Sequence, residues 1–229
     1  MANQLDLEEQ EQLDQLKHFW NQYGNAITWL LIVVLGSVAA WNGYQYWQRN
    51  QATQAAALYD EIERVVRSGD IQKSERAFSE MKDRFASTVY TQHAGLLVAK
   101  AAWEAGKVDV AKSTLTWLAE KSTDKGLASI AKLRLSSILV ETKALDEALK
   151  VLDSGITDEF QALVADRKGD IYVLQGKKQD AKPFYLTAYK AFDERTEYRR
   201  LVEVKLGALG VVVEADAAAS GAGTAEGSK

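Results

Sequence analysis

The chain has 229 residues, of which 47% are hydrophobic and 26% are charged, a balance that is typical of folded proteins and excludes a largely disordered chain. It contains no cysteine and a single proline, so disulfides, zinc–thiolate sites and cysteine nucleophiles are excluded, and an all-α fold is favoured. The formal net charge of −4 lies within residues 1–24; the balanced remainder predicts no basic face and no nucleic-acid partner.

Residues 1–24 form an acidic segment with five acidic residues and one lysine. Its apolar residues Leu13, Leu16 and Trp20 recur at steps of three and four, which predicts a helix that continues into the next segment. A short helix that docks on a partner is the alternative interpretation.

Residues 25–47 are predicted to form a transmembrane helix. No Lys, Arg, Asp or Glu occurs in the 30 residues between His18 and Arg49. As a helix, 20 residues rise about 30 Å, which is the thickness of the hydrocarbon layer. Aromatic side chains flank the apolar centre, as expected at the two membrane interfaces; the predicted interface residues are Trp20, Tyr23, Trp41, Tyr44 and Trp47.

Two other interpretations of this apolar segment remain open. A buried core helix would be shorter and would show a polar stripe. A cleaved signal peptide would begin with a short basic region, whereas this chain begins with an acidic one. The length and the flanking residues therefore favour a single span retained in the lipid bilayer, although the few nearby Lys and Arg residues do not decide its orientation.

Residues 48–212 show paired helices that recur every 33 to 37 residues. Short turns separate the helices of each pair. Three turns contain a glycine, at Gly69, Gly106 and Gly176, and the fourth, at Thr142–Lys143, contains none. Alanines follow at a constant distance, namely Ala111, Ala148 and Ala181. A recurrence of this length predicts a solenoid of helical hairpins.

Small and large residues alternate regularly around these turns. Helices of adjacent pairs approach closely only where side chains are small, and small residues stand seven positions before three of the turns, at Ala99, Ser136 and Gly169. Larger residues fill the gaps, at Leu115, Leu152 and Tyr185. All six are interpreted as packing residues. Pro183 is expected in the first turn of a helix, where its missing N–H is tolerated.

This spacing resembles the tetratricopeptide repeat over roughly residues 90–190, with a degenerate pair at 51–86. The terminal proline that should end each unit is missing. The resemblance implies that the first helices of the pairs line a concave groove. On this chain, the resemblance places eight partner-binding residues in the groove, namely Leu96, Lys100, Trp103, Leu133, Val140, Asp166, Asp170 and Val173.

The groove has two candidate occupants. Its apolar residues suit an extended hydrophobic peptide from a partner. Alternatively, the predicted last helix, residues 193–209, fills the groove, because a solenoid needs a cap. Residues 213–229, rich in Ala, Gly and Ser, are expected to be disordered because they bury too little apolar surface.

No pattern predicts catalysis, a cofactor or a metal site. The two histidines, His18 and His93, have no second ligand or nucleophile nearby in sequence. Adjacent acidic residues such as Asp60 and Glu61 point to different helix faces and form no catalytic pair. The stretch Gly176-Lys-Lys178 lacks the Ser or Thr and the preceding strand of a phosphate-binding loop. The chain is therefore not expected to be an enzyme.

Several motifs, in this order, give a family resemblance. The acidic start leads to Leu16-Lys-His-Phe-Trp20, Trp41 and Tyr46-Trp47 follow the span, and the repeat domain contains Val164-Ala-Asp-Arg-Lys-Gly-Asp170 and Gly176-Lys-Lys-Gln-Asp-Ala181. In this arrangement the chain resembles the YfgM family, ancillary subunits of the bacterial Sec translocon.

The resemblance implies a single-pass protein of the bacterial inner membrane, with its N-terminus in the cytoplasm and its repeat domain in the periplasm. It also implies association with the SecYEG channel and with the membrane-anchored periplasmic chaperone PpiD, and help in passing unfolded client polypeptides to periplasmic chaperones. A tether would raise the local concentration of the domain near the channel exit. The alternative function is a membrane-anchored repeat scaffold for cell-envelope assembly.

Overall fold

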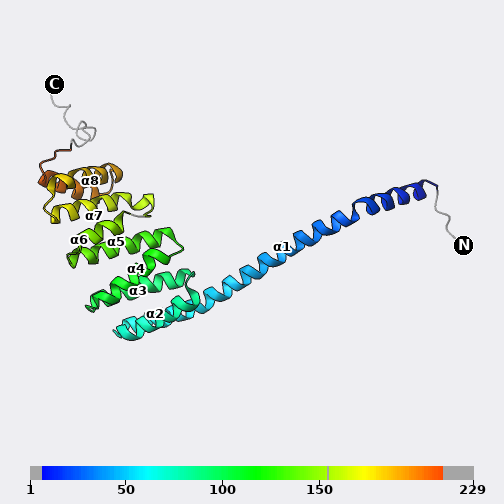
Figure 1. Ribbon diagram of the computed structural model, residues 1–229, viewed down its shortest axis with the longest axis horizontal. Helices are drawn as coiled ribbons and strands as arrows, with labels where there is room; N and C mark the ends of the chain where they lie inside the picture. The colour runs from blue at the N-terminus through cyan, green and yellow to red at the C-terminus, as the bar shows by residue number, and fades with distance from the viewer. Residues whose placement is uncertain (1–6, 154, 214–229) are drawn as a thin grey trace, which may run out of the picture. The chain divides into compact units, whose positions relative to one another are not determined.

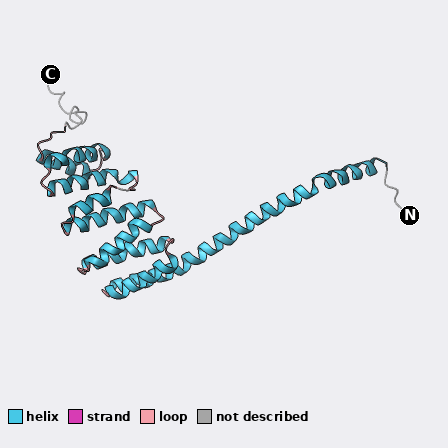
Figure 2. Cartoon of the chain, in the orientation of Figure 1, coloured by secondary structure: helices cyan, strands magenta, loops and turns pink. Residues whose placement is uncertain are grey.

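The computed structural model describes residues 7–153 and 155–213. Within these ranges every regular element is a helix and no strand occurs (Figure 2), so the prediction of an all-α fold is confirmed. The chain divides into two compact units, Met1–Gln54 and Ala55–Lys229, which are described separately. The predicted tail, residues 213–229, lies outside the described residues except for Val213.

The first unit consists of the N-terminal part of helix α1 (Leu7–Arg67). Polar side chains in its apolar stretch bond back to their own helix. Thr28 Oγ1, Ser37 Oγ and Asn42 Nδ2 each donate to a backbone carbonyl four residues earlier, at 2.7, 2.7 and 2.9 Å. Because hydrocarbon offers no water to satisfy polar groups, this internal pairing suits a helix that lies in a bilayer.

Helix α1 is long and apolar enough to cross a membrane, and only 6% of its most apolar 18-residue segment is buried inside the protein. This exposure argues against a core helix, which would be mostly buried. The five predicted interface aromatics are all exposed, namely Trp20, Tyr23, Trp41, Tyr44 and Trp47. The rings of Tyr44 and Trp47 stack with their centroids 6.1 Å apart.

The second unit is a series of helical hairpins, and Figure 1 shows α2 to α8 stacked in chain order. It begins with the last part of α1 and continues with α2 (Ile71–Phe85), α3 (Val89–Glu104), α4 (Val108–Lys121), α5 (Lys125–Glu141), α6 (Leu145–Leu152), a short 3₁₀ helix η1 (Asp158–Phe160), α7 (Gln161–Leu174), α8 (Lys178–Ala191) and α9 (Glu197–Ala208). The predicted solenoid of hairpins is confirmed.

The turns within the hairpins share one backbone geometry. Gly69, Gly106 and Gly176 have φ values of 79°, 71° and 76°, and Lys143, at the turn without glycine, has a φ of 61°. After α3, α5 and α7 the residue beyond the turn donates its N–H to a carbonyl five residues earlier, at 2.8, 2.8 and 2.9 Å. This bond closes the helix end in a Schellman motif. Among the described residues, Lys143 is the one non-glycine with positive φ.

The predicted small residues lie where helices cross. Ala99 and Ser136 are 2% and 0% exposed. A Cβ atom built on Gly169 would lie 2.5 Å from Cε1 of Tyr185, so the ring of this α8 residue packs directly on the glycine and leaves no room for a side chain. Gly95, which the repeat alignment did not single out, has the same role: its Cβ would lie 2.8 Å from Cζ of Phe78.

One helix is short, and two local features differ from the sequence-based expectations. Helix α6 has 8 residues whereas its equivalents α4 and α8 have 14 each. Pro183 is the sixth residue of α8 and not in its first turn, so the helix loses one backbone hydrogen bond there. Helix α9 begins at Glu197, four residues later than predicted, because the Asp193 carbonyl and carboxylate accept from the N–H groups of Thr196 and Arg195 in a turn, at 2.9 and 2.8 Å.

Candidate functional site

Two adjoining clefts lie along the first helices of successive hairpins. The first, between α3 and α5, has a volume of about 200 Å³ and is lined by residues that include Lys100, Trp103, Arg134, Ser137, Ile138 and Glu141. The second, bordered by α5, η1, α7 and α9, has a volume of about 290 Å³ and is lined by Ile130, Leu133, Arg134, Ser137, Phe160, Leu163, Asp166, Arg167 and Tyr198. Arg134 and Ser137 belong to both clefts. We call the surface formed by these two clefts the first-helix face.

The structure brings together some of the eight predicted partner-binding residues. Lys100 and Trp103 line the first cleft, and Leu133 and Asp166 line the second. The other apolar residues pack partly buried against the core, Leu96 and Val140 against its central part and Val173 against its C-terminal part. Asp170 takes part in an ion-pair network and lines neither cleft.

This network joins α7 to α8 and α9 through two aspartates. Asp166 is 2% exposed and accepts from Tyr198 Oη at 2.8 Å and from Lys205 Nζ at 2.7 and 2.9 Å. Asp170 accepts from Tyr185 Oη at 2.7 Å and from the same lysine at 2.9 Å. The carboxylates are therefore satisfied within the protein, and α9 covers this end of the first-helix face.

The two tyrosines of the network have raised pKa values. Burial and the hydrogen bond to Asp166 raise the pKa of Tyr198 to about 12. Burial and the hydrogen bond to Asp170 raise the pKa of Tyr185 still further. Both effects favour the neutral phenol, because an anionic oxygen beside a carboxylate would be repelled. At neutral pH both hydroxyls therefore donate to the aspartates: Tyr198 ties α9 to α7, and Tyr185 ties α8 to α7.

Two arginines of the first-helix face were not singled out from the sequence. Arg134 and Arg167 stand 33 residues apart, directly after the aligned residues Leu133 and Asp166. They therefore occupy equivalent positions in two successive repeats, which the sequence alone could have shown. Within residues 7–153 and 155–213, neither guanidinium forms an ion pair or a hydrogen bond. Lys100, in contrast, lies 3.7 Å from the carboxylate of Glu104.

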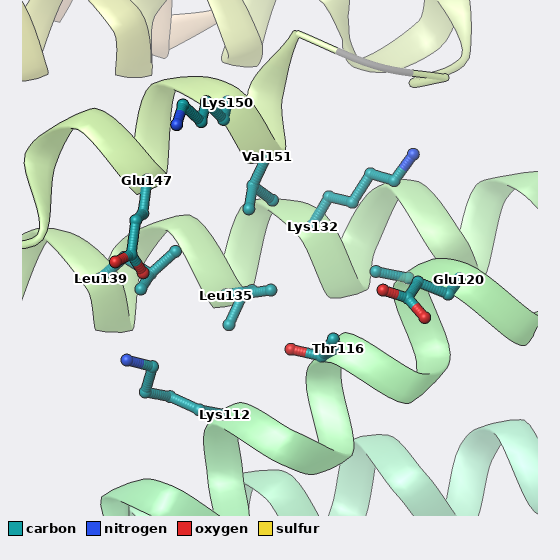
Figure 3. A pocket seen from close by; sticks show the side chains of 10 residues that line it. Lys112, Thr116, Glu120, Lys132, Leu135, Leu139, Glu147, Lys150 and Val151 are labelled. Carbon is teal, nitrogen blue, oxygen red and sulfur yellow. The ribbon is translucent and has the colours of Figure 1, made fainter.

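A third cleft, of about 460 Å³, lies between α4, α5 and α6 (Figure 3). Leu135 and Leu139, at its floor, are buried, with exposed fractions of only 5% and 3%. Charged side chains of both signs surround them, namely Lys112, Glu120, Lys132, Glu147 and Lys150. It contains none of the predicted site residues. Within the part of the chain that the structure describes, no three His, Cys, Asp or Glu residues are placed to hold a metal ion.

Comparison with known proteins identifies the family. Residues 17–211 match the tetratricopeptide repeat-like domain. The chain is 32% identical over 176 residues to the ancillary SecYEG translocon subunit of Haemophilus influenzae, covering 77% of this chain and 86% of the relative. The chain belongs to the family of ancillary SecYEG translocon subunits. Subunits of the same name from Neisseria gonorrhoeae and Escherichia coli are 28% and 24% identical, each over 89% of this chain and over 98% and 97% of their own length.

Membership in the ancillary translocon subunit family confirms the resemblance found in the sequence. The match extends over the apolar helix as well as the repeats, since it begins at residue 17. The relatives from Neisseria gonorrhoeae and Escherichia coli are covered almost from end to end, so the similarity is not limited to the repeats.

Proposed function

We propose that this chain is a single-pass inner-membrane protein that associates with the SecYEG translocon. Residues 1–24 would lie in the cytoplasm, 25–47 would span the membrane with the five aromatics at its interfaces, and 48–212 would form a periplasmic domain. The observation that supports this most strongly is the near full-length similarity to curated ancillary SecYEG translocon subunits. The apolar, exposed helix α1 supports the membrane anchor.

The proposed role is to bind partners and not to catalyse a reaction. Together with the membrane-anchored chaperone PpiD, the subunit would help pass translocated proteins from SecYEG to the periplasmic chaperone network. Its anchor would confine the repeat domain to the channel exit, so that weak contacts with partners and client polypeptides suffice. The first-helix face, with its two clefts and polar residues, is the proposed contact surface.

Co-purification in mild detergent tests this association. The tagged full-length protein is expected to recover SecYEG and PpiD in comparable amounts from membranes. A matched control carries the same tag on an unrelated single-span protein. Recovery of cell-wall enzymes without translocon components would refute the proposal and favour a scaffold for cell-envelope assembly.

Cysteine labelling tests the proposed orientation, since the natural chain has no cysteine. Lys190→Cys in the repeat domain and Gln12→Cys before the span both replace exposed residues. In cells whose outer membrane alone is permeabilised, a membrane-impermeant maleimide is expected to label the Lys190→Cys protein. The Gln12→Cys protein should react only after the inner membrane is opened, and the reverse pattern would contradict the proposed topology.

A further inference from the structure

Among the residues that the structure describes, Arg134 is the one charged residue that borders both clefts of the first-helix face, and Arg167 lies at the equivalent position of the next hairpin. We propose that this face binds a short segment of a partner protein in which an Asp or Glu lies between large apolar side chains. The inference rests on the proposed partner-binding function and specifies the chemistry of the segment that the face recognises.

The charge of the clefts favours a carboxylate. A guanidinium keeps its charge at any physiological pH and presents a planar fork that pairs with a carboxylate through two hydrogen bonds. Among the described residues no ion pair joins Asp166 to Arg167, since the Asp166 oxygens accept from Lys205 and Tyr198. Glu141 also lines the first cleft, yet it forms no ion pair with Arg134 among the described residues. Both arginines therefore have free donors.

The remaining lining favours apolar side chains on either side of that carboxylate. Trp103 and Ile138 line the first cleft, and Leu133, Phe160 and Leu163 line the second. An Asp or Glu paired with Arg134 at the junction would place the neighbouring residues of the same segment toward the two clefts. Apolar surroundings also strengthen the pair, because they lower the local dielectric.

The size of the clefts favours side chains of a protein over a small molecule. Their volumes of about 200 and 290 Å³ fall below the roughly 300–1,000 Å³ of typical small-molecule pockets. Two small clefts that share one arginine instead suit a peptide that places one apolar side chain in each.

A peptide titration tests this inference. The probe is a fluorescein-labelled peptide, Ser-Leu-Asp-Phe-Glu-Leu-Gly-Ser, and fluorescence anisotropy follows its binding to the full-length protein in detergent micelles. A matched peptide carries Asn and Gln in place of Asp and Glu. The acidic peptide is expected to bind at least about tenfold more tightly than its amide counterpart, which is the gain expected from a hydrogen-bonded charge pair. Added salt should reduce that difference.

Arginine variants then locate the site. Arg134→Gln and Arg167→Gln are each expected to weaken binding of the acidic peptide about tenfold, and Arg134→Lys should recover part of the affinity because it keeps the charge without the fork. Arg76→Gln, an exposed arginine of α2 outside both clefts, makes the same charge change and should have no effect. Far-UV circular dichroism checks that each variant is folded.

Three results would overturn the inference: equal affinity for the two peptides, unchanged affinity in the Arg134 and Arg167 variants, or an equal loss in Arg76→Gln. The titration uses purified protein and contains no translocon. Its failure would therefore refute the preference for acidic segments, whereas failure of the translocon association would appear in the co-purification experiment alone.

Discussion

Gly169→Ala is expected to destabilise the C-terminal hairpins even though alanine is the better helix former. The added Cβ would lie 2.5, 2.6 and 2.9 Å from Cε1, Cδ1 and Cζ of Tyr185, whereas carbon atoms in good contact are about 3.5–4.0 Å apart. The ring would have to move by about 1 Å. It is 3% exposed and its hydroxyl is bonded to Asp170 at 2.7 Å, so no free space receives it.

The net magnitude follows from two opposing effects. Overpacking a filled site costs about 1–3 kcal/mol, and disturbing the Tyr185 hydrogen bond adds about 1 kcal/mol. Replacing a helical glycine by alanine stabilises the helix by about 1 kcal/mol, which offsets part of this cost. The free energy of unfolding should therefore fall by about 2 kcal/mol.

The assay combines urea unfolding, followed by far-UV circular dichroism, with amide hydrogen exchange of peptides from α7 and α8. Exchange in these two helices should accelerate, while α3 and α4 should change less, because hairpins contact only their neighbours. Gly207→Ala is the matched control: this helical glycine has no atom within 4 Å of its built Cβ, so the variant should be unchanged or more stable by up to about 1 kcal/mol. Equal gains in both variants would refute the close crossing at Gly169.

Three further predictions concern stability. Lys205→Met should lower the free energy of unfolding by about 3 kcal/mol, since Asp166 stays buried without its cation; urea unfolding measures this, and a change below about 0.5 kcal/mol, the scale of a surface substitution, would contradict it. Lys143→Gly should raise the free energy of unfolding by up to about 1 kcal/mol because glycine adopts the positive φ without strain, and an unchanged or lower thermal midpoint would count against this reason. The wild-type protein should lose stability as pH rises from about 10 toward 12, because folded Tyr198 keeps the proton that the unfolded chain releases; thermal melts of Tyr198→Phe should show a shallower decline, and an identical decline would exclude this tyrosine as a cause.

The fold followed from local patterns in the sequence. Apolar residues at helical spacing and turns that recur every 33 to 37 residues predict where most helices begin and end, and the register even placed a turn at Lys143, where no glycine marks it. The end of α6 could not be predicted in this way. Helix α6 ends at Leu152, where no glycine marks the end; the next glycine, Gly155 with a φ of 58°, comes only beyond it.

The site was less predictable because its contacts join distant residues. The repeat register assigned Asp166 and Asp170 to a groove, yet Lys205, 39 and 35 residues away, occupies their oxygens. No local pattern relates a lysine to carboxylates on a helix two elements earlier. Arg134 and Arg167 differ in this respect, because they share a repeat position, and comparing aligned positions for charge as well as size would have found them.

The short helix α6 also leads to an expectation of how the hairpins respond to force. In a linear array, opening spreads from one joint to the next, so the joint with the least buried apolar surface yields first. Helix α6 contributes only 8 residues to its joint with α7, and side-chain bonds reinforce it, from Lys168 to Asp153 at 2.6 Å and from Gln175 to Asp146 at 2.9 Å. If a moving polypeptide pulls on the domain, extension should start at this joint, and the hairpins on either side can then separate as intact blocks.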